Sequence, residues 1–218
     1  MKISFEESLP QVVGKIDVVH KEMCFTMYMP IKMPEQGIQD MLNNIPPEFK
    51  RSMNELVEQI WMNEESLTNL HSKYMYITVK HTYVSPESMS QRMGWHIDSF
   101  GSDGINYIWY SDVPTEICAQ EFDISENDAQ SLRDMEEQST QDNIITIPSG
   151  HLLRLDNKVV HRVSENHDYS GMRTFVKVSI SDKKFNLIGN AKNHYMDYDW
   201  KMHSRAELRN LESNDDYA

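Results

Sequence analysis

The residues best suited to chemistry in this sequence are a histidine and an aspartate at close spacing. His96 and Asp98 stand in the segment MGWHIDSFG. If that segment is extended, alternate side chains point to the same side, so the pair offers one imidazole nitrogen and one carboxylate oxygen to a single metal ion. Because the chain has 9 histidines and many acidic residues, an H-x-D pair arises readily by chance and indicates a site only together with further ligands.

A second group of candidate residues follows in the segment HLLRLDNKVVHRV, residues 151–163, whose pattern predicts two short strands. This segment places His161 at the end of an apolar run. Two histidines and one carboxylate form a facial triad with open positions on the metal, which is typical of non-haem Fe(II) oxygenases. Arg173 begins the last predicted strand, and its guanidinium could bind the distal carboxylate of a chelating keto acid through paired hydrogen bonds.

Other residues compete for these two roles. His151 and His167 flank His161, and each is an alternative for the distal histidine ligand. Arg162 and Lys177 are alternatives for the carboxylate partner, although the strand parity of Arg162 opposes that of His161. The sequence alone therefore leaves both assignments open.

Two tyrosines stand on strands that are expected to neighbour the site. Tyr76 belongs to the run 74–84 and Tyr107 to the run 105–110. Either hydroxyl could donate a hydrogen bond to a keto acid or to a substrate, and we therefore include both as candidate cofactor-binding residues. The competing interpretation for each is packing in the core, as for most tyrosines on buried strands.

Hydrophobic periodicity predicts the elements that must position these residues. Residues 12–33 are rich in Val, Ile, Phe and Tyr and predict one or two strands. Residues 47–62 carry apolar side chains at helical spacing behind Pro46 and Pro47, which predicts an amphipathic helix. Residues 74–84 alternate with a period of two and predict a strand. Further short β-rich runs follow at 105–110, 115–124, 143–147, 151–155, 158–163 and 172–181.

The fold class follows from these short runs. One predicted helix, residues 126–138 with Ser125 as its expected N-cap, interrupts them. Many short strands separated by turns predict a mainly β architecture with flanking helices, of the sandwich, barrel or jelly-roll type. In the run 172–181, apolar residues alternate with Arg173 and other polar residues. Such a strand is either half-exposed, with Arg173 in water, or covered on both faces. We expect the second arrangement, with the helix at 47–62 on the apolar face and a polar cavity on the other face.

Composition excludes several functional classes. The chain has 218 residues and a formal charge of −13, which disfavours binding of extended nucleic acid and suits a small-molecule or protein side-chain substrate. The chain lacks an apolar run long enough to span a membrane, so no membrane association is expected. The N-terminus lacks the long apolar stretch of a secretory signal, and the 2 cysteines suit a reducing, cytoplasmic compartment.

The order W-H-x-D, P-x-G ahead of a strand, H-R-V and then R-T-F-V-K-V resembles the Fe(II)/2-oxoglutarate-dependent dioxygenase superfamily. The resemblance covers about half of the chain. It implies a double-stranded β-helix core, which is a relative of the jelly roll and of the cupin barrel. The domain would span residues 1–182, with strands and helices of 1–73 buttressing a core at 74–182. Residues 183–218 would form an acidic C-terminal extension, partly disordered.

The same resemblance implies roles for the matching residues. His96, Asp98 and His161 would be the Fe(II) ligands and the catalytic centre, and Arg173 would anchor 2-oxoglutarate. The implied reaction uses O₂ and converts 2-oxoglutarate into succinate while an unidentified substrate is hydroxylated or oxidatively demethylated. Asp98 argues against the halogenating branch, which lacks this carboxylate.

Two alternative classes stay open. A cupin-like metal enzyme that does not use 2-oxoglutarate would have no need of Arg173. A non-catalytic ligand-binding β-helix protein would have no need of the complete set His96, Asp98 and His161.

Overall fold

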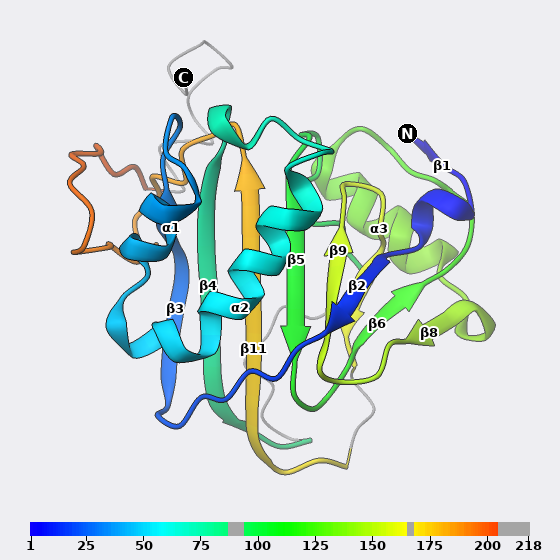
Figure 1. Ribbon diagram of the computed structural model, residues 1–218. Coiled ribbons are helices and arrows are strands. Elements are labelled where there is room, and N and C mark those ends of the chain that lie inside the picture. The colour runs from blue at the N-terminus through cyan, green and yellow to red at the C-terminus, as the bar shows by residue number, and fades with distance from the viewer. Residues whose placement is uncertain (87–93, 165–167, 205–218) are drawn as a thin grey trace.

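The computed structural model describes residues 1–86, 94–164 and 168–204, and its main feature is a large antiparallel sheet (Figure 1). Within these residues the sheet has six strands. Their order across the sheet is β2 (Gln11–Lys15), β9 (His151–Leu155), β5 (Ile105–Tyr110), β11 (Gly171–Ser181), β4 (Tyr74–Val84) and β3 (Cys24–Lys32). The two long central strands β11 and β4 pair over their whole length. Strands close in space are thus far apart in sequence, as in sandwiches and barrels.

Two smaller sheets complete the β structure of the described residues. One has the order β10 (His161–Val163), β6 (Thr115–Cys118) and β8 (Ile144–Thr146). The other pairs β1 (Lys2–Ile3) with β7 (Phe122–Asp123). All of these strand pairs are antiparallel. The prediction of a mainly β fold with few helices is therefore confirmed.

Helices cover the sheets from outside. They are α1 (Ile38–Asn44), α2 (Pro47–Glu64) and α3 (Asp128–Gln138), with short 3₁₀ turns at Glu6–Ser8, Leu70–Ser72 and Gln141–Asn143. The long helix α2 crosses one face of the large sheet (Figure 1). Its Leu56 and Ile60 belong to one buried cluster with Val176 and Val178 of β11. The predicted helix and the predicted apolar face of the last strand are thus confirmed.

The start of α3 differs from the prediction. Asn127, not Ser125, is the N-cap, because the Asn127 side chain accepts a hydrogen bond from the backbone N–H of Gln130. The Ser125 hydroxyl oxygen instead accepts from the backbone N–H of Asn127. Both residue types favour helix N-caps, so the sequence alone could not separate them.

The chain after β11 returns to the sheet. The ring of Phe185 stacks on Tyr76 at a centroid distance of 4.2 Å. The fully buried Asn193 donates from Nδ2 to the carbonyls of Pro30 (2.7 Å) and Asn44 (2.9 Å). The first part of the expected C-terminal extension therefore packs on the domain, whereas residues 205–218, for which we expect partial disorder, lie outside the described residues.

A buried carboxylate ties α2 to the sheet. Glu64 has no exposed surface and accepts hydrogen bonds from Tyr107 (2.7 Å), Thr68 (2.5 Å) and Arg154, with which it also forms an ion pair. Burial by itself raises the pKa of Glu64, but these three donors outweigh it and hold the pKa below its ordinary value. The network fixes the end of α2 against β5 and β9.

This network gives a stability prediction. Glu64→Gln should lower the free energy of unfolding at pH 7 by about 2 kcal/mol, because it leaves the half-buried Arg154 charge without its counter-ion. The matched change Glu58→Gln on the exposed face of α2 should stay within about 0.5 kcal/mol. Urea unfolding measures both, and equal effects of the two substitutions would contradict the assignment.

The same experiment has a pH signature. Since the folded-state pKa of Glu64 lies below its unfolded value, its carboxylate stabilises the fold above that unfolded value, near pH 4. The contribution is lost as the pH falls through the folded pKa. The gap between wild type and Glu64→Gln should therefore narrow in acid below about pH 4.

Candidate metal centre

His96 and His161 are brought together by their backbones. The His96 N–H donates to the His161 carbonyl (3.0 Å), and the His161 N–H donates to the His96 carbonyl (2.9 Å). This isolated antiparallel bridge adds His96 to the outer edge of the sheet formed by β10, β6 and β8. Residues that face each other in such a bridge carry their side chains on the same face, about 5 Å apart. The two imidazole centroids accordingly lie 4.6 Å apart.

The alternation of the segment around His96 decides where its side chains point. Trp95 and Ile97 are buried in a cluster with Phe122 and with Met135 of α3. His96 and Asp98 therefore project to the opposite side, as the H-x-D spacing predicts. The apolar residues between the polar ones thus serve to orient the candidate ligands.

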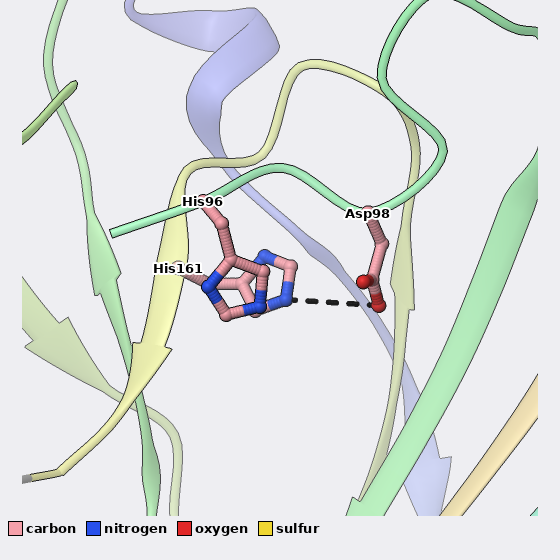
Figure 2. A group of neighbouring side chains, drawn as sticks. All are labelled: His96, Asp98 and His161. Atoms are coloured by element: carbon pink, nitrogen blue, oxygen red, sulfur yellow. Dashed lines mark ion pairs between the residues drawn. The ribbon is translucent and has the colours of Figure 1, made fainter. Parts of the chain in front are cut away.

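The three candidate ligands form one group. Their ligand atoms all lie within 4.8 Å of one another. Figure 2 shows the two imidazoles side by side with the Asp98 carboxylate facing them, and the His161 Nε2 to Asp98 Oδ2 distance is 3.8 Å. Neighbouring ligands of one metal lie about 3 Å apart when each metal–ligand bond is near 2.1 Å. A small side-chain movement would therefore bring all three onto one ion.

The tautomers of both histidines suit metal binding. The Nδ1 of His96 donates to the Gly94 carbonyl and the Nδ1 of His161 to the Val159 carbonyl, each at 2.9 Å. A carbonyl only accepts, so the proton lies on Nδ1 and the lone pair lies on Nε2. Metal-ligating histidines are usually oriented in this way.

Lys177 holds the carboxylate of the group. Its Nζ donates to Asp98 Oδ2 (3.0 Å) and to the Tyr28 hydroxyl (3.1 Å). Burial by itself would raise the pKa of Asp98, but the Lys177 ammonium, joined by the two imidazoles when they are protonated, holds it well below its usual range. Burial would likewise lower the pKa of Lys177, but Asp98 and Tyr28 hold it above its ordinary value. Asp98 is therefore ionised and able to act as a ligand at neutral pH.

The group opens into a cavity of about 220 Å³ between the large and the small sheet. This volume lies below the 300–1,000 Å³ typical of drug-sized ligands, so the cavity suits a small molecule. Besides the group, its lining includes Thr78, Lys80, Thr115, Arg162, Phe175 and Lys177. Three of these side chains are cationic. Lys177 is paired with the Asp98 carboxylate and Arg162 with Glu116.

Arg173 is buried on the cavity side of β11. It is 2% exposed, and its Nε donates to the carbonyls of Asp112 (2.8 Å) and Val113 (3.0 Å). Among the described residues, neither terminal guanidinium nitrogen has a hydrogen-bond partner. Burial lowers the pKa of Arg173 to about 10, only partly offset by Tyr110 and Asp112, so it stays charged at neutral pH. Buried donors of this kind are rarely left unsatisfied.

The structure relates Arg173 to the metal group through β11. Arg173, Phe175 and Lys177 alternate along one face of the strand, and the last two line the cavity. The guanidinium carbon of Arg173 lies 5.4 Å from the centroid of the Phe175 ring. The same face of β11 thus carries Lys177, which binds Asp98, and Arg173, whose terminal nitrogens lack a partner among the described residues.

The two candidate tyrosines lie elsewhere. Tyr107 faces α2, where its hydroxyl donates to Glu64, so the structure does not bring it to the metal group. Tyr76 lies on the cavity-side face of β4, but its hydroxyl donates to the Lys183 carbonyl (2.9 Å) and accepts from the Phe185 N–H (3.0 Å). Strand parity shows which residues of one strand share a face. It does not show which face of the sheet α2 covers, so the sequence could not separate the two tyrosines.

The competing residues are also placed. His151 lies in β9, where its Nδ1 donates to the Pro148 carbonyl, and it is not part of the metal group. His167 lies outside the described residues. Arg162 lines the cavity despite its opposed parity and pairs with Glu116 at 2.7 Å. Sequence reasoning did not find the contact of Lys177 with Asp98, although the shared parity of residues 173, 175 and 177 was a signal for it.

Comparisons with known proteins do not identify the chain. No protein-family model matches it, and a search of curated proteins finds no match. In the part of the chain that the structure describes, no helix is long and apolar enough to cross a membrane.

We predict that the group binds a divalent metal ion. Mn(II) titration followed by electron paramagnetic resonance should show one site in the wild type. Because loss of outer partners alone costs 10- to 100-fold in affinity, Asp98→Ala and His161→Ala should weaken binding by at least about 100-fold. His151→Ala is the matched control and should bind as the wild type does. Undiminished affinity in His161→Ala would contradict the assignment.

Proposed function

We propose that the protein is a non-haem Fe(II)/2-oxoglutarate-dependent dioxygenase that hydroxylates or oxidatively demethylates its substrate. His96, Asp98 and His161 would hold Fe(II), and Arg173 would bind the distal carboxylate of 2-oxoglutarate. The observation that carries the proposal is the unsatisfied, buried guanidinium of Arg173 on the strand face that also lines the metal cavity. A bidentate carboxylate would supply the partners that its terminal nitrogens lack.

The donor set supports iron as the metal. Two neutral imidazoles and one carboxylate on one side of an ion match the ligands of non-haem Fe(II) oxygenases and leave coordination positions open. Bound iron, together with 2-oxoglutarate and O₂, would supply the oxidising power, with 2-oxoglutarate leaving as succinate and CO₂. The protein contributes the orientation of these partners.

The groups that surround the metal ligands have separate roles under this proposal. The backbone carbonyls of Gly94 and Val159 hold the two imidazoles with their Nε2 atoms toward the ion. Lys177 keeps Asp98 ionised and oriented. Burial of Arg173 strengthens its attraction for a carboxylate by excluding water.

The architecture is consistent with a double-stranded β-helix. Two antiparallel sheets face each other with the metal group between them, and helices buttress the outer face of the large sheet. The fold class supports the proposal but does not carry it, because the same barrel serves many reactions.

The other two classes account for less of the structure. A cupin-like metal enzyme without 2-oxoglutarate would leave the buried guanidinium of Arg173 without a function. A non-catalytic binding protein would have no need of two histidines with matched tautomers beside a carboxylate. The complete arrangement favours the oxygenase.

The proposal predicts a ternary complex that can be seen in the visible spectrum. Anaerobic addition of 2-oxoglutarate to the Fe(II)-loaded protein should produce a metal-to-ligand charge-transfer band, because the keto acid chelates the iron. His161→Ala should not produce it. A wild-type protein that binds Fe(II) but gives no band would contradict the proposal.

The anchor gives a separate prediction. Arg173→Ala should weaken 2-oxoglutarate binding by about 10- to 100-fold, the worth of one charge-assisted hydrogen-bond pair, while Mn(II) affinity is kept. Arg133→Ala, at an exposed position of α3, is the control and should leave both affinities unchanged. Isothermal titration measures both ligands. An unchanged 2-oxoglutarate affinity in Arg173→Ala would move the anchor to Arg162.

A further inference from the structure

A second cavity adjoins the metal group on the side of the C-terminal segment. Its volume is about 500 Å³, within the range of small-molecule sites. Tyr28, Asp98 and Lys177 line both this cavity and the smaller one. The far wall is formed by residues 183–187 and Asn190. A ligand in this cavity would therefore lie directly beside the Asp98 carboxylate.

The charge of this cavity is opposite to that of the whole chain. Lys177, Lys183 and Lys184 line it, and Asp98, already engaged by Lys177, is its one carboxylate. Lys183 is exposed and Lys184 is half-buried, and neither forms an ion pair with another described residue. In a chain of net charge −13, two lysines in the lining of one cavity that form no ion pair with the described residues favour an anionic ligand.

One wall presents hydrogen-bond donors. The Ser179 hydroxyl donates to Asn106 Oδ1 (2.6 Å), and Asn106 Nδ2 donates to the Ser99 hydroxyl oxygen (3.1 Å). This direction leaves the Ser99 hydrogen to donate to a ligand. Ser99 has a φ of 60°, a backbone conformation that is uncommon for non-glycine residues. A Cβ at Gly104 would lie 2.4 Å from the Ser99 oxygen, so only glycine allows this placement.

The opposite wall offers an apolar surface and an acceptor. Phe185 stacks on Tyr76 and meets the ring of Tyr28 edge to face at 5.1 Å. Asn190 donates from Nδ2 to the Phe185 carbonyl (2.7 Å), while its Oδ1 is buried and has no partner among the described residues. A hydroxyl group of a ligand would satisfy this acceptor.

We infer that this cavity binds the substrate, and that the substrate is a small polar organic anion. Its carboxylate or phosphate lies between Lys183 and Lys184, a hydroxylated carbon chain runs between the Ser99 and Asn190 walls, and one carbon lies beside the metal group. The role as substrate site rests on the proposed oxygenase function. The anion site itself rests only on the side chains of the cavity.

Binding to three probes of one carbon skeleton tests the inference. Gluconate, glucose 6-phosphate and glucose carry a carboxylate, a phosphate and no charge, respectively. Isothermal titration into the full-length protein with bound Mn(II) should show at least one of the two anions binding tenfold or more tightly than glucose. The tighter anion then distinguishes carboxylate from phosphate recognition. Enhanced relaxation of its carbon-bound protons by Mn(II) should place it beside the metal.

A charge-neutralising variant provides the second arm. Lys183→Gln combined with Lys184→Gln should weaken the preferred anion about tenfold and leave glucose unaffected. The matched control Lys192→Gln combined with Lys201→Gln changes two exposed lysines of the same segment outside the cavity and should bind as the wild type does. Both variants should keep the Fe(II)–2-oxoglutarate band of the wild type.

Three results would overturn the inference: no anion of the panel binds, glucose binds as tightly as the anions, or the variant at Lys183 and Lys184 binds them as tightly as the wild type. A missing charge-transfer band in the wild type would instead overturn the oxygenase function. In that case, charge-dependent anion binding would still establish the site. The two failures are therefore distinguishable.

Discussion

The site depends on one antiparallel bridge between the backbones of His96 and His161. Two hydrogen bonds join segments that are distant in the chain and set two imidazoles side by side. The rest follows from alternation along each segment, because residues two apart share a face. Asp98 follows His96 onto the cavity side, while Trp95 and Ile97 are buried on the other side. A shift of the bridge by one residue would turn one imidazole to the other face of the sheet, and the three candidate ligands would no longer lie together.

A cavity between two sheets is a costly place for charge, and the protein manages that cost in two ways. Asp98 is compensated by Lys177, which the large sheet supplies from β11. Arg173, on the same strand face, is compensated only at its Nε, which leaves its terminal nitrogens without partners among the described residues. The first pair keeps a ligand ionised. The second leaves two buried hydrogen-bond donors without a partner among the described residues, and under the proposed function a carboxylate of 2-oxoglutarate would supply it.

The sequence predicted the local part of this structure well. The period-two strand at 74–84, the helix behind Pro47 and the two faces of β11 all depend on near neighbours in the chain, and the structure confirms them. Long-range pairing is different. Parity groups the residues of β5 by face but does not show which face α2 covers, so it could not place Tyr107 beside Glu64. Parity is also a weak guide in β10, which is only three residues long, and Arg162 reaches the cavity against it. The sequence pattern also could not show that the segment 183–190 lines a second cavity, because that segment has no hydrophobic periodicity.

The proposed function requires that a single metal ion and 2-oxoglutarate occupy the cavity together. A crystal structure of the protein with Mn(II) and 2-oxoglutarate, prepared without Fe(II) so that no turnover occurs, tests this most directly. We expect a metal bonded to Nε2 of His96, Nε2 of His161 and a carboxylate oxygen of Asp98, with the distal carboxylate of the keto acid on the terminal nitrogens of Arg173. A metal bound at other residues, or a keto acid that leaves Arg173 unpaired, would contradict it.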